Sequence, residues 1–147
     1  MVCLGNICRS PLAEGILQKK VKHLNIKVDS AGTAGYHIGN PPDIRSVEIA
    51  SKYNIDITKQ RARKFNTEDF KLFDKIYAMD RNNYQDLQSM AKSKEDADKI
   101  KMILNEVDSD SFESVPDPYY GNGDGFQIVY NMLDKACDKI LKKIEQR

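Results

Sequence analysis

The chain contains few cysteines, only three among its 147 residues. Secreted proteins that are stapled by disulfides carry many paired cysteines, whereas cytosolic proteins keep few cysteines and keep them reduced. The first apolar residues are interrupted at once by Gly5, Asn6 and Arg9, so we expect no signal peptide. The composition therefore argues against a disulfide-rich secreted scaffold and predicts a cytoplasmic protein.

Long hydrophobic runs and excess charge are also missing. No apolar stretch approaches the roughly 18 residues that a membrane span needs, and the formal net charge is only +1. So weak a charge gives no field that would attract nucleic acid or a membrane surface. Neither His23 nor His37 lies at metal-ligand spacing. We expect a monomer without a nucleic-acid or membrane partner, a metal or a cofactor.

No repeat, low-complexity tract or linker divides the sequence, so residues 1–147 are expected to form one domain. Short apolar runs predict strands at 26–30, 74–80 and 99–104. Apolar residues at helical spacing predict helices at 11–24, 43–53, 81–90 and 124–146. Ser10 is expected to cap the first of these helices. The alternation of strands and helices predicts an α/β fold with a parallel sheet.

The segment "CLGNICRS" at residues 3–10 precedes the first predicted helix. Ligands of parallel sheets bind beyond the carboxyl ends of the strands, and this loop takes that position if Met1 and Val2 end a strand. Two residues are too few for a central strand. We therefore expect the first strand to be truncated here, with the natural start lying upstream.

A loop of this composition can hold an oxyanion against a thiolate. Its successive backbone N–H groups and the positive end of the following helix favour an anion, and Gly5 permits a backbone conformation that other residues resist. Arg9 can bind two phosphate oxygens at once. The same surroundings favour the thiolate form of Cys3, to which Ser10 can donate a hydrogen bond. Asn6 can tie the loop to itself.

Attack of a thiolate on a phosphate ester also needs an acid for the leaving oxygen. Asp117 is the candidate, because Pro116 and Pro118 stiffen the chain on either side of it. Tyr119 and Tyr120 add aromatic surface next to this carboxyl group. The alternative for an Asp-Pro pair is an acidic surface turn without a catalytic role.

Together these motifs resemble the low-molecular-weight protein tyrosine phosphatases. The family carries its nucleophile in a C-x5-R-S loop and its acid in a D-P-Y/F loop, which correspond to "CLGNICRSP" (3–11) and "DPYYG" (117–121). Further similar segments are "DSAGT" (29–33), "YHIGNPPDIRS" (36–46), "QRARKF" (60–65) and "FDKIYAMDRNN" (73–83). The resemblance implies a three-layer α/β sandwich, with a four-stranded parallel sheet in flavodoxin-like order and helices on both faces.

The resemblance also implies metal-free hydrolysis of phosphotyrosine through a cysteinyl-phosphate intermediate. Cys3 is then the nucleophile, Arg9 binds the phosphate, and Asp117 acts first as acid and then as base. The substrate would be a phosphotyrosine protein such as a bacterial tyrosine kinase. Ser30 is expected to support the loop. The residues expected to bind the substrate are Leu4, Gly5, Asn6, Ile7, Cys8 and Ser10 in the loop, with Tyr36, Tyr119 and Tyr120 as aromatic walls.

Cys8 lies five residues after Cys3, and the displacement chemistry does not need it. An accessible thiolate is prone to irreversible oxidation, and a neighbouring thiol can trap its first oxidised form as a reversible disulfide. One hypothesis is that Cys8 protects Cys3 in this way. The other is that Cys8 packs as a small apolar residue under the loop.

Three other functions are compatible with parts of this sequence. A thiol-linked arsenate reductase needs further cysteines, and none lies between Cys8 and Cys137. Protein-arginine phosphatases on this scaffold resemble "CTGNTCRS", with a threonine at the position of Ile7, whereas an apolar Ile7 suits a phenyl ring. A non-catalytic phosphate-binding module would not need Asp117. We therefore predict a protein tyrosine phosphatase.

Overall fold

The computed structural model describes residues 1–121 and 123–147. Its centre is a four-stranded, all-parallel sheet with the strand order β2-β1-β3-β4, which confirms the predicted flavodoxin-like order. The strands are β1 (Val2–Cys3), β2 (Ala31–Gly32), β3 (Ile76–Ala78) and β4 (Ile100–Met102). Val2 pairs with Ala31 on one side and with Ala78 on the other, so β1 lies in the middle of the sheet.

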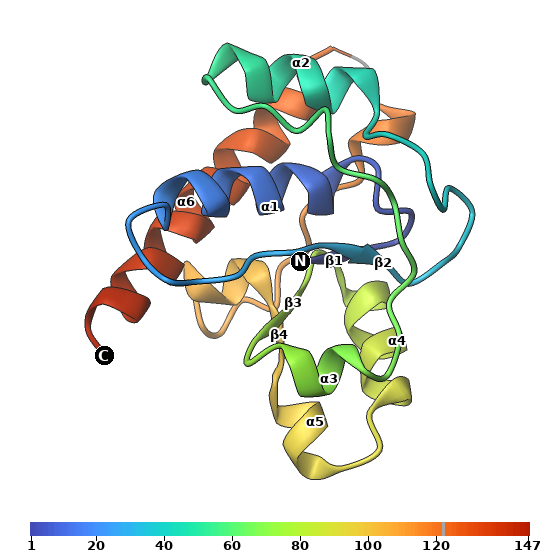
Figure 1. Cartoon of the computed structure of the whole chain (residues 1–147), viewed down its shortest axis with the longest axis vertical. Helices are drawn as coiled ribbons and strands as arrows, with labels where there is room; N and C mark the ends of the chain where they lie inside the picture. The colour runs from blue at the N-terminus through green and yellow to red at the C-terminus, as the bar shows by residue number, and fades with distance from the viewer. Residues whose placement is uncertain (122) are drawn as a thin grey trace.

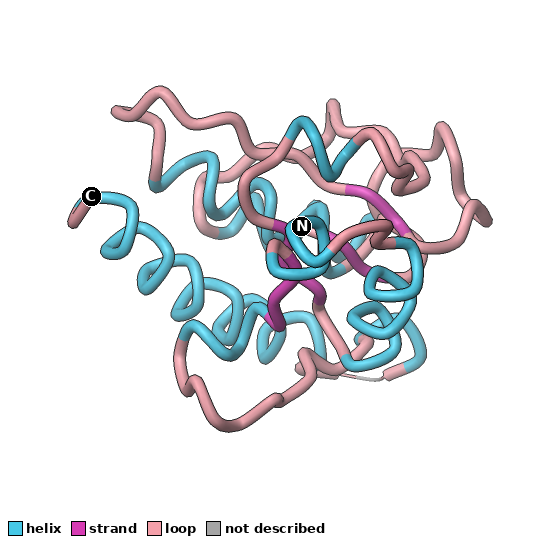
Figure 2. Tube along the Cα trace, turned by 90° about the horizontal axis from the view of Figure 1, so that it is seen from below, coloured by secondary structure: helices cyan, strands magenta, loops and turns pink. Residues whose placement is uncertain are grey.

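Helices cover both faces of this sheet, as predicted (Figures 1 and 2). The helices α1 (Arg9–Lys20), α2 (Ile44–Lys52) and α6 (Gly125–Glu145) pack against one another on one side. The helices α3 (Asp69–Leu72), α4 (Arg81–Met90) and α5 (Lys94–Asp98) lie on the other side. The short 3-10 helices η1 (Ile103–Glu106) and η2 (Pro118–Tyr120) complete the elements.

The alternation of side chains along the strands divides the core into two clusters. Cys3, Tyr77 and Met79 pack with α1 and α6 on one face. Val2 and Ala78 pack with α4 on the other. Cys3 therefore begins the site loop with its side chain already on the face that α1 covers. Among the described residues, no helix is long and apolar enough to cross a membrane.

The first helix differs from its prediction at its start. It begins at Arg9 with Cys8 as the capping residue, and no side chain caps it. The prediction of Ser10 as the cap was wrong, because the Ser10 hydroxyl lies inside the first turn and interacts with Cys3 and Asn6 instead. The residues of α1 from Arg9 to Leu17 are all buried, since the helix lies between the sheet and two other helices.

The predicted strand at 26–30 was also wrong. These residues form no ladder, and β2 begins only at Ala31. A strand needs a neighbour to pair with, and β1 offers only Val2 and Cys3, which pair with Ala31 and Gly32. The predictions at 74–80 and 99–104 contain β3 and β4, and the predicted helix at 81–90 coincides with α4.

Candidate active site

The loop after β1 curves around a cavity of about 300 Å³ at the carboxyl end of the sheet. This cavity brings together most of the residues that the sequence singled out, although they come from three distant segments. Its walls are formed by Cys3, Leu4, Gly5, Ile7, Cys8, Arg9, Tyr36, His37, Asp117, Tyr119 and Tyr120. Asn6 and Ser10 of the loop, and Ser30, do not line the cavity; they are hydrogen-bonded to one another instead.

Cys3 lines this cavity, and only 3% of the residue is exposed. Its Sγ is 3.0 Å from the Ser10 hydroxyl and accepts a hydrogen bond from the Asn6 backbone N–H at 3.3 Å. The first turn of α1 follows directly after the loop. Hydrogen-bond donors and a helix N-terminus both favour a negatively charged sulfur.

Asn6 holds the loop in a conformation that side chains disfavour. Its φ of 57° lies in the left-handed region. The Asn6 amide donates both hydrogens, to the hydroxyls of Ser10 at 2.8 Å and Ser30 at 2.9 Å, and its Oδ1 accepts from the Arg63 backbone N–H at 3.0 Å. The Ser10 oxygen accepts from Asn6, and the same hydroxyl can donate its hydrogen to the Cys3 sulfur.

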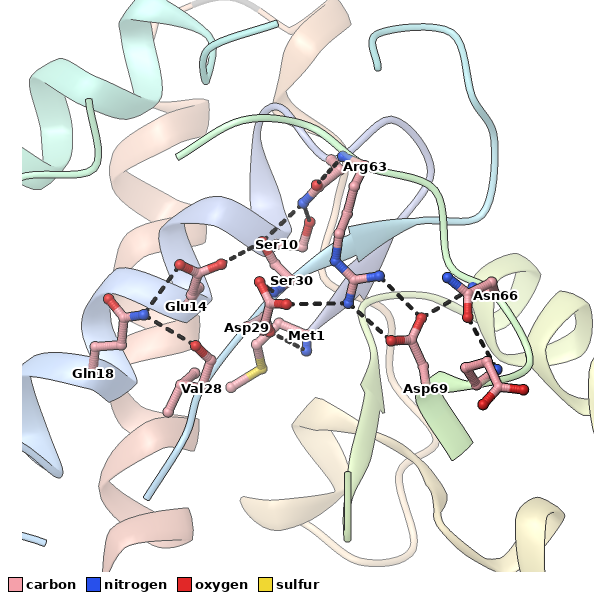
Figure 3. A network of polar contacts seen from close by, with 12 residues as sticks. Met1, Ser10, Glu14, Gln18, Val28, Asp29, Ser30, Arg63, Asn66 and Asp69 are labelled. Atoms are coloured by element: carbon pink, nitrogen blue, oxygen red, sulfur yellow. Dashed lines mark hydrogen bonds and ion pairs between the residues drawn. The ribbon is translucent and has the colours of Figure 1, made fainter. Parts of the chain in front are cut away.

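This network continues into the protein (Figure 3). The Ser30 hydroxyl donates to Glu14 Oε1 at 2.7 Å, and Gln18 donates to the other oxygen of Glu14 at 3.2 Å. Burial raises the pKa of the Glu14 carboxyl group above its ordinary value. Two bonds between buried side chains therefore connect Glu14 to Asn6, and so to the loop.

Arg63 fixes the network from its other side (Figure 3). While its backbone N–H holds Asn6, its guanidinium pairs with Asp29 at 3.2 Å and with both oxygens of Asp69 at 3.0 and 3.1 Å. The sequence analysis did not identify Arg63 or Glu14. Arg63 lies in the segment 60–65 that resembles the family, whereas Glu14 lies in the predicted helix 11–24, and the contacts of both depend on the tertiary fold.

Arg9 is buried and oriented by two acceptors before any substrate arrives. One terminal nitrogen donates to Asp80 Oδ2 at 2.7 Å and to the Val115 carbonyl at 3.0 Å. Asp80 also caps α4, where its Oδ1 accepts from the Asn83 N–H at 2.7 Å. This contact with Arg9 was not predicted from the sequence. Asp80 ends the predicted strand 74–80, and the carboxyl ends of parallel strands are where ligands bind, so its position could have indicated a residue of the site.

Asp117 lines the same cavity. Its Oδ2 is 3.6 Å from the second terminal nitrogen of Arg9, and its Oδ1 accepts from the Tyr119 N–H at 3.0 Å. The second bond makes Asp117 the cap of η2, so Pro118 and the two tyrosines follow in a fixed turn. The carboxyl group therefore has one oxygen held by its own loop and the other directed to the site.

Aromatic side chains stand around the mouth. The rings of Tyr119 and Tyr120 meet edge to face, with centroids 5.0 Å apart. Tyr36 and Tyr120 are largely exposed, at 76% and 84%. His37 also lines the cavity, which the sequence analysis did not foresee. A Cβ added to Gly5 would lie 3.0 Å from the His37 ring, so the close approach of this ring favours glycine at position 5.

Cys8 lines the same cavity as Cys3, and both residues are buried. Burial raises the pKa of its thiol to about 12, with Asp43 and Cys3 adding to the effect. All three cysteines are free in this structure. Cys137 packs in the core beneath α1, where burial also raises its pKa to about 12. In the described ranges, no cluster of histidine, cysteine and acidic side chains could hold a metal ion.

Comparison with known proteins agrees with this geometry. Residues 1–147 match the family model described as low molecular weight phosphotyrosine protein phosphatase. The chain belongs to this family. A Bacillus subtilis member, the low molecular weight protein-tyrosine-phosphatase YfkJ, is 42% identical over 150 residues, which cover 99% of this chain and 94% of the relative.

Solved structures give the same assignment. A protein tyrosine phosphatase from Entamoeba histolytica, with Hepes in its active site, superimposes with a TM-score of 0.91 at 37% identity, covering 99% of this chain and 94% of that one. A structure described as DARP, a Drosophila arginine phosphatase, has a TM-score of 0.90 at 31% identity and covers 98% and 95%. The fold of this family thus also occurs in a protein described as an arginine phosphatase.

Proposed function

We propose that this phosphatase hydrolyses phosphotyrosine in proteins through a cysteinyl-phosphate intermediate on Cys3. The observation that carries the proposal is the environment of the Cys3 sulfur, which lies 3.0 Å from the Ser10 hydroxyl and 3.3 Å from the Asn6 N–H. Arg9 and Asp117 line the same cavity. A thiolate, a fixed cation and an acid are the groups that this chemistry needs.

The loop is the phosphate-binding element in this proposal. Its backbone N–H groups and the N-terminus of α1 receive the phosphate oxygens. Asp80 and the Val115 carbonyl hold one nitrogen of Arg9, so its remaining N–H groups are oriented toward the phosphate. The Cys3 sulfur then forms its bond to phosphorus as the bond from phosphorus to the phenolic oxygen breaks.

Asp117 handles the protons of both steps. It donates a proton to the leaving phenolic oxygen, which departs as a neutral tyrosine side chain. The resulting carboxylate then takes a proton from a water molecule that attacks the phosphorus. This second displacement releases inorganic phosphate and restores the Cys3 thiolate. The 3.6 Å separation of Asp117 from Arg9 supports this role, since it places the carboxyl group beside the phosphate-binding cation.

The walls favour an aromatic substrate. Tyr36 on one side, and Tyr119 and Tyr120 on the other, frame a passage to the buried sulfur that a phenyl ring can span. Phosphoserine is too short to reach the same depth. Phosphoarginine is the second candidate, because a Drosophila arginine phosphatase shares the fold. Ile7 in the cavity wall favours the phenyl ring, since its side chain offers apolar contact and no hydrogen bond.

We also propose that the enzyme works as a monomer in the cytoplasm, on a protein substrate such as a bacterial tyrosine kinase. One chain supplies the complete set of Cys3, Arg9 and Asp117, which supports a monomer. The three free cysteines support a reducing compartment. The B. subtilis relative, which is described as a protein-tyrosine-phosphatase, supports a bacterial phosphoprotein as substrate.

The Cys3→Ser variant tests the proposal. A serine hydroxyl has no anionic form near neutral pH, so hydrolysis of a phosphotyrosine peptide should be lost while calorimetry still detects phosphate binding. Arg9→Lys should also fail, because lysine cannot make the planar two-point contact. Turnover by Cys3→Ser within roughly tenfold of the parent would contradict the assignment of Cys3. Loss of turnover with retained binding in Asp117→Ala would separate an enzyme from a phosphate-binding module.

A further inference from the structure

Arg45 connects the two loops of the active site. It lies in the first turn of α2, outside the cavity wall, and its side chain is 40% exposed. Its Nε and one terminal nitrogen donate to the two oxygens of Asp43, both at 2.9 Å. Its other terminal nitrogen donates to the Tyr119 carbonyl at 3.3 Å. One side chain therefore contacts both the start of α2 and the acid loop, residues 117–121.

The start of α2 is itself bonded to the phosphate-binding loop. The Asp43 backbone N–H donates to the Ile7 carbonyl at 2.8 Å, and the Ser46 hydroxyl donates to the Cys8 carbonyl at 3.2 Å. Arg45 lowers the pKa of Asp43 by its hydrogen bonds, so this ion pair is formed near neutral pH. A continuous set of bonds thus runs from Ile7 through Asp43 and Arg45 to Tyr119.

The guanidinium also lies over two aromatic rings. It lies 5.3 Å from the ring centroid of Tyr119 and 4.7 Å from that of Phe126 at the start of α6. An exposed ion pair alone contributes little to stability. Here, however, the planar guanidinium binds both carboxylate oxygens of Asp43, lies over two rings and donates to the acid loop, a combination that lysine cannot reproduce.

The acid loop has few other polar connections to the rest of the protein. Within the described residues, its hydrogen bonds besides that from Arg45 are local, from Tyr119 N–H to Asp117 and from Gly121 N–H to the Pro118 carbonyl. The Arg9–Asp117 ion pair is the other link, and a bound phosphate would compete for Arg9. Arg45 is then the remaining polar link between the acid loop and the phosphate-binding loop.

We propose that Arg45 is a positioning residue for the general acid, which holds the Asp117 loop at a fixed distance from the phosphate-binding loop. The proposal rests on the assignment of Asp117 under the proposed function. Its consequence is specific: loss of Arg45 should impair proton donation to the leaving oxygen and leave the attack by Cys3 largely intact. A residue needed only for folding would affect both equally.

Esters with different leaving groups separate these two effects. Phenyl phosphate has a poor leaving group that needs the acid, whereas 2,4-dinitrophenyl phosphate has a good one that does not. In Arg45→Ala, kcat/KM, which reports the steps up to departure of the phenol and not the later hydrolysis of the intermediate, should fall at least roughly tenfold more for phenyl phosphate than for the dinitrophenyl ester. Arg45→Lys keeps the charge but loses the planar guanidinium. It should also lose more activity toward phenyl phosphate than toward the dinitrophenyl ester, by a smaller factor.

Lys52→Ala is the matched control, because Lys52 also joins α2 to α6, through Gln127 at 2.9 Å, but does not touch the acid loop. It should leave both rates near those of the parent. Asp117→Ala should reproduce the leaving-group dependence, and adding Arg45→Ala to it should cost little more. Equal losses for both esters in Arg45→Ala, or additive losses in the double variant, would overturn the proposal alone. An Asp117→Ala variant without leaving-group dependence would overturn the proposed function and this inference together.

Discussion

The Ser10 hydroxyl lies 3.0 Å from the Cys3 sulfur and has its oxygen occupied by the Asn6 amide. A thiolate can only accept, so an ionised Cys3 takes the hydroxyl hydrogen of Ser10 in this contact, which stabilises the thiolate more than the thiol. A hydrogen bond to a charged group typically contributes about 1.5–3 kcal/mol.

Replacing Ser10 with alanine should therefore reduce the thiolate character of Cys3. We expect kcat for a phosphotyrosine peptide to fall by roughly ten- to a hundredfold, with a parallel slowing of iodoacetamide inactivation near neutral pH. Ser30→Ala is the matched control, since Ser30 contacts Asn6 but not the sulfur; its effect should be smaller. An unchanged alkylation rate in Ser10→Ala would show that the hydroxyl does not stabilise the thiolate.

Cys8 and Cys3 line one cavity, so oxidation can test whether they form a protective disulfide. After peroxide inactivation, dithiothreitol should restore activity in the parent, through a Cys3–Cys8 disulfide, and fail to restore it in Cys8→Ala. Because burial raises the pKa of Cys8 to about 12, its thiolate fraction should grow with pH, and disulfide formation should accelerate as pH rises toward that value. Equal recovery in both proteins, or no intramolecular disulfide by mass spectrometry, would leave Cys8 with a packing role.

The raised pKa of Glu14 should make the free energy of unfolding depend on pH. Burial raises this pKa in the folded chain, so the folded state binds the proton more tightly than the unfolded state does. The resulting stabilisation is present below the unfolded pKa of about 4.3 and is lost as pH rises through the folded value. Glu14→Gln does not titrate, so the free energy of unfolding of the parent minus that of the variant should decrease with rising pH. Urea unfolding of both proteins at several pH values measures this difference, and a difference that increases with pH would contradict it.

Ile7 should influence the choice between phosphotyrosine and phosphoarginine. The parent should cleave a phosphotyrosine peptide much faster than phosphoserine or phosphoarginine peptides, because the walls fit a phenyl ring. Ile7→Thr should lower the ratio of kcat/KM for phosphotyrosine over phosphoarginine by roughly tenfold, since it removes apolar contact and adds a hydroxyl. Faster cleavage of phosphoarginine than of phosphotyrosine by the parent would contradict the claim that Ile7 favours a phenyl ring. Comparable rates on phosphoserine and phosphotyrosine would contradict the claim that phosphoserine is too short to reach the sulfur.

The parts of the fold that depend on local sequence were predictable. The helix at 81–90 was predicted to the residue, because Asp80 caps it and its apolar residues follow helical spacing. The extended segment at 26–30 was not, because its pairing depends on the length of β1, which is distant in the sequence. The short helices α3 and α5, with four and five residues, are too brief to show a periodic pattern.

In the candidate site too, the parts that are local in sequence were predictable and the long-range contacts were not. The loop from Cys3 to Ser10 is contiguous, so its composition alone indicated its chemistry. The orientation of Arg9 by Asp80 spans 71 positions, and the link from Arg45 to Tyr119 spans 74. Such contacts exist only after the sheet and helices bring the segments together, so no local pattern could have shown them.

The central claim is that Cys3 carries the phosphoryl group during turnover, and direct detection of that intermediate tests it. Asp117→Ala should slow the hydrolysis of the intermediate because no base activates the water. With 2,4-dinitrophenyl phosphate as substrate, which needs no acid for its departure, rapid acid quenching followed by mass spectrometry should find one phosphoryl group on the peptide containing Cys3. Cys3→Ser/Asp117→Ala should show none. Product release from Asp117→Ala without any phosphorylated Cys3 peptide, or a phosphoryl group on another residue, would contradict the account.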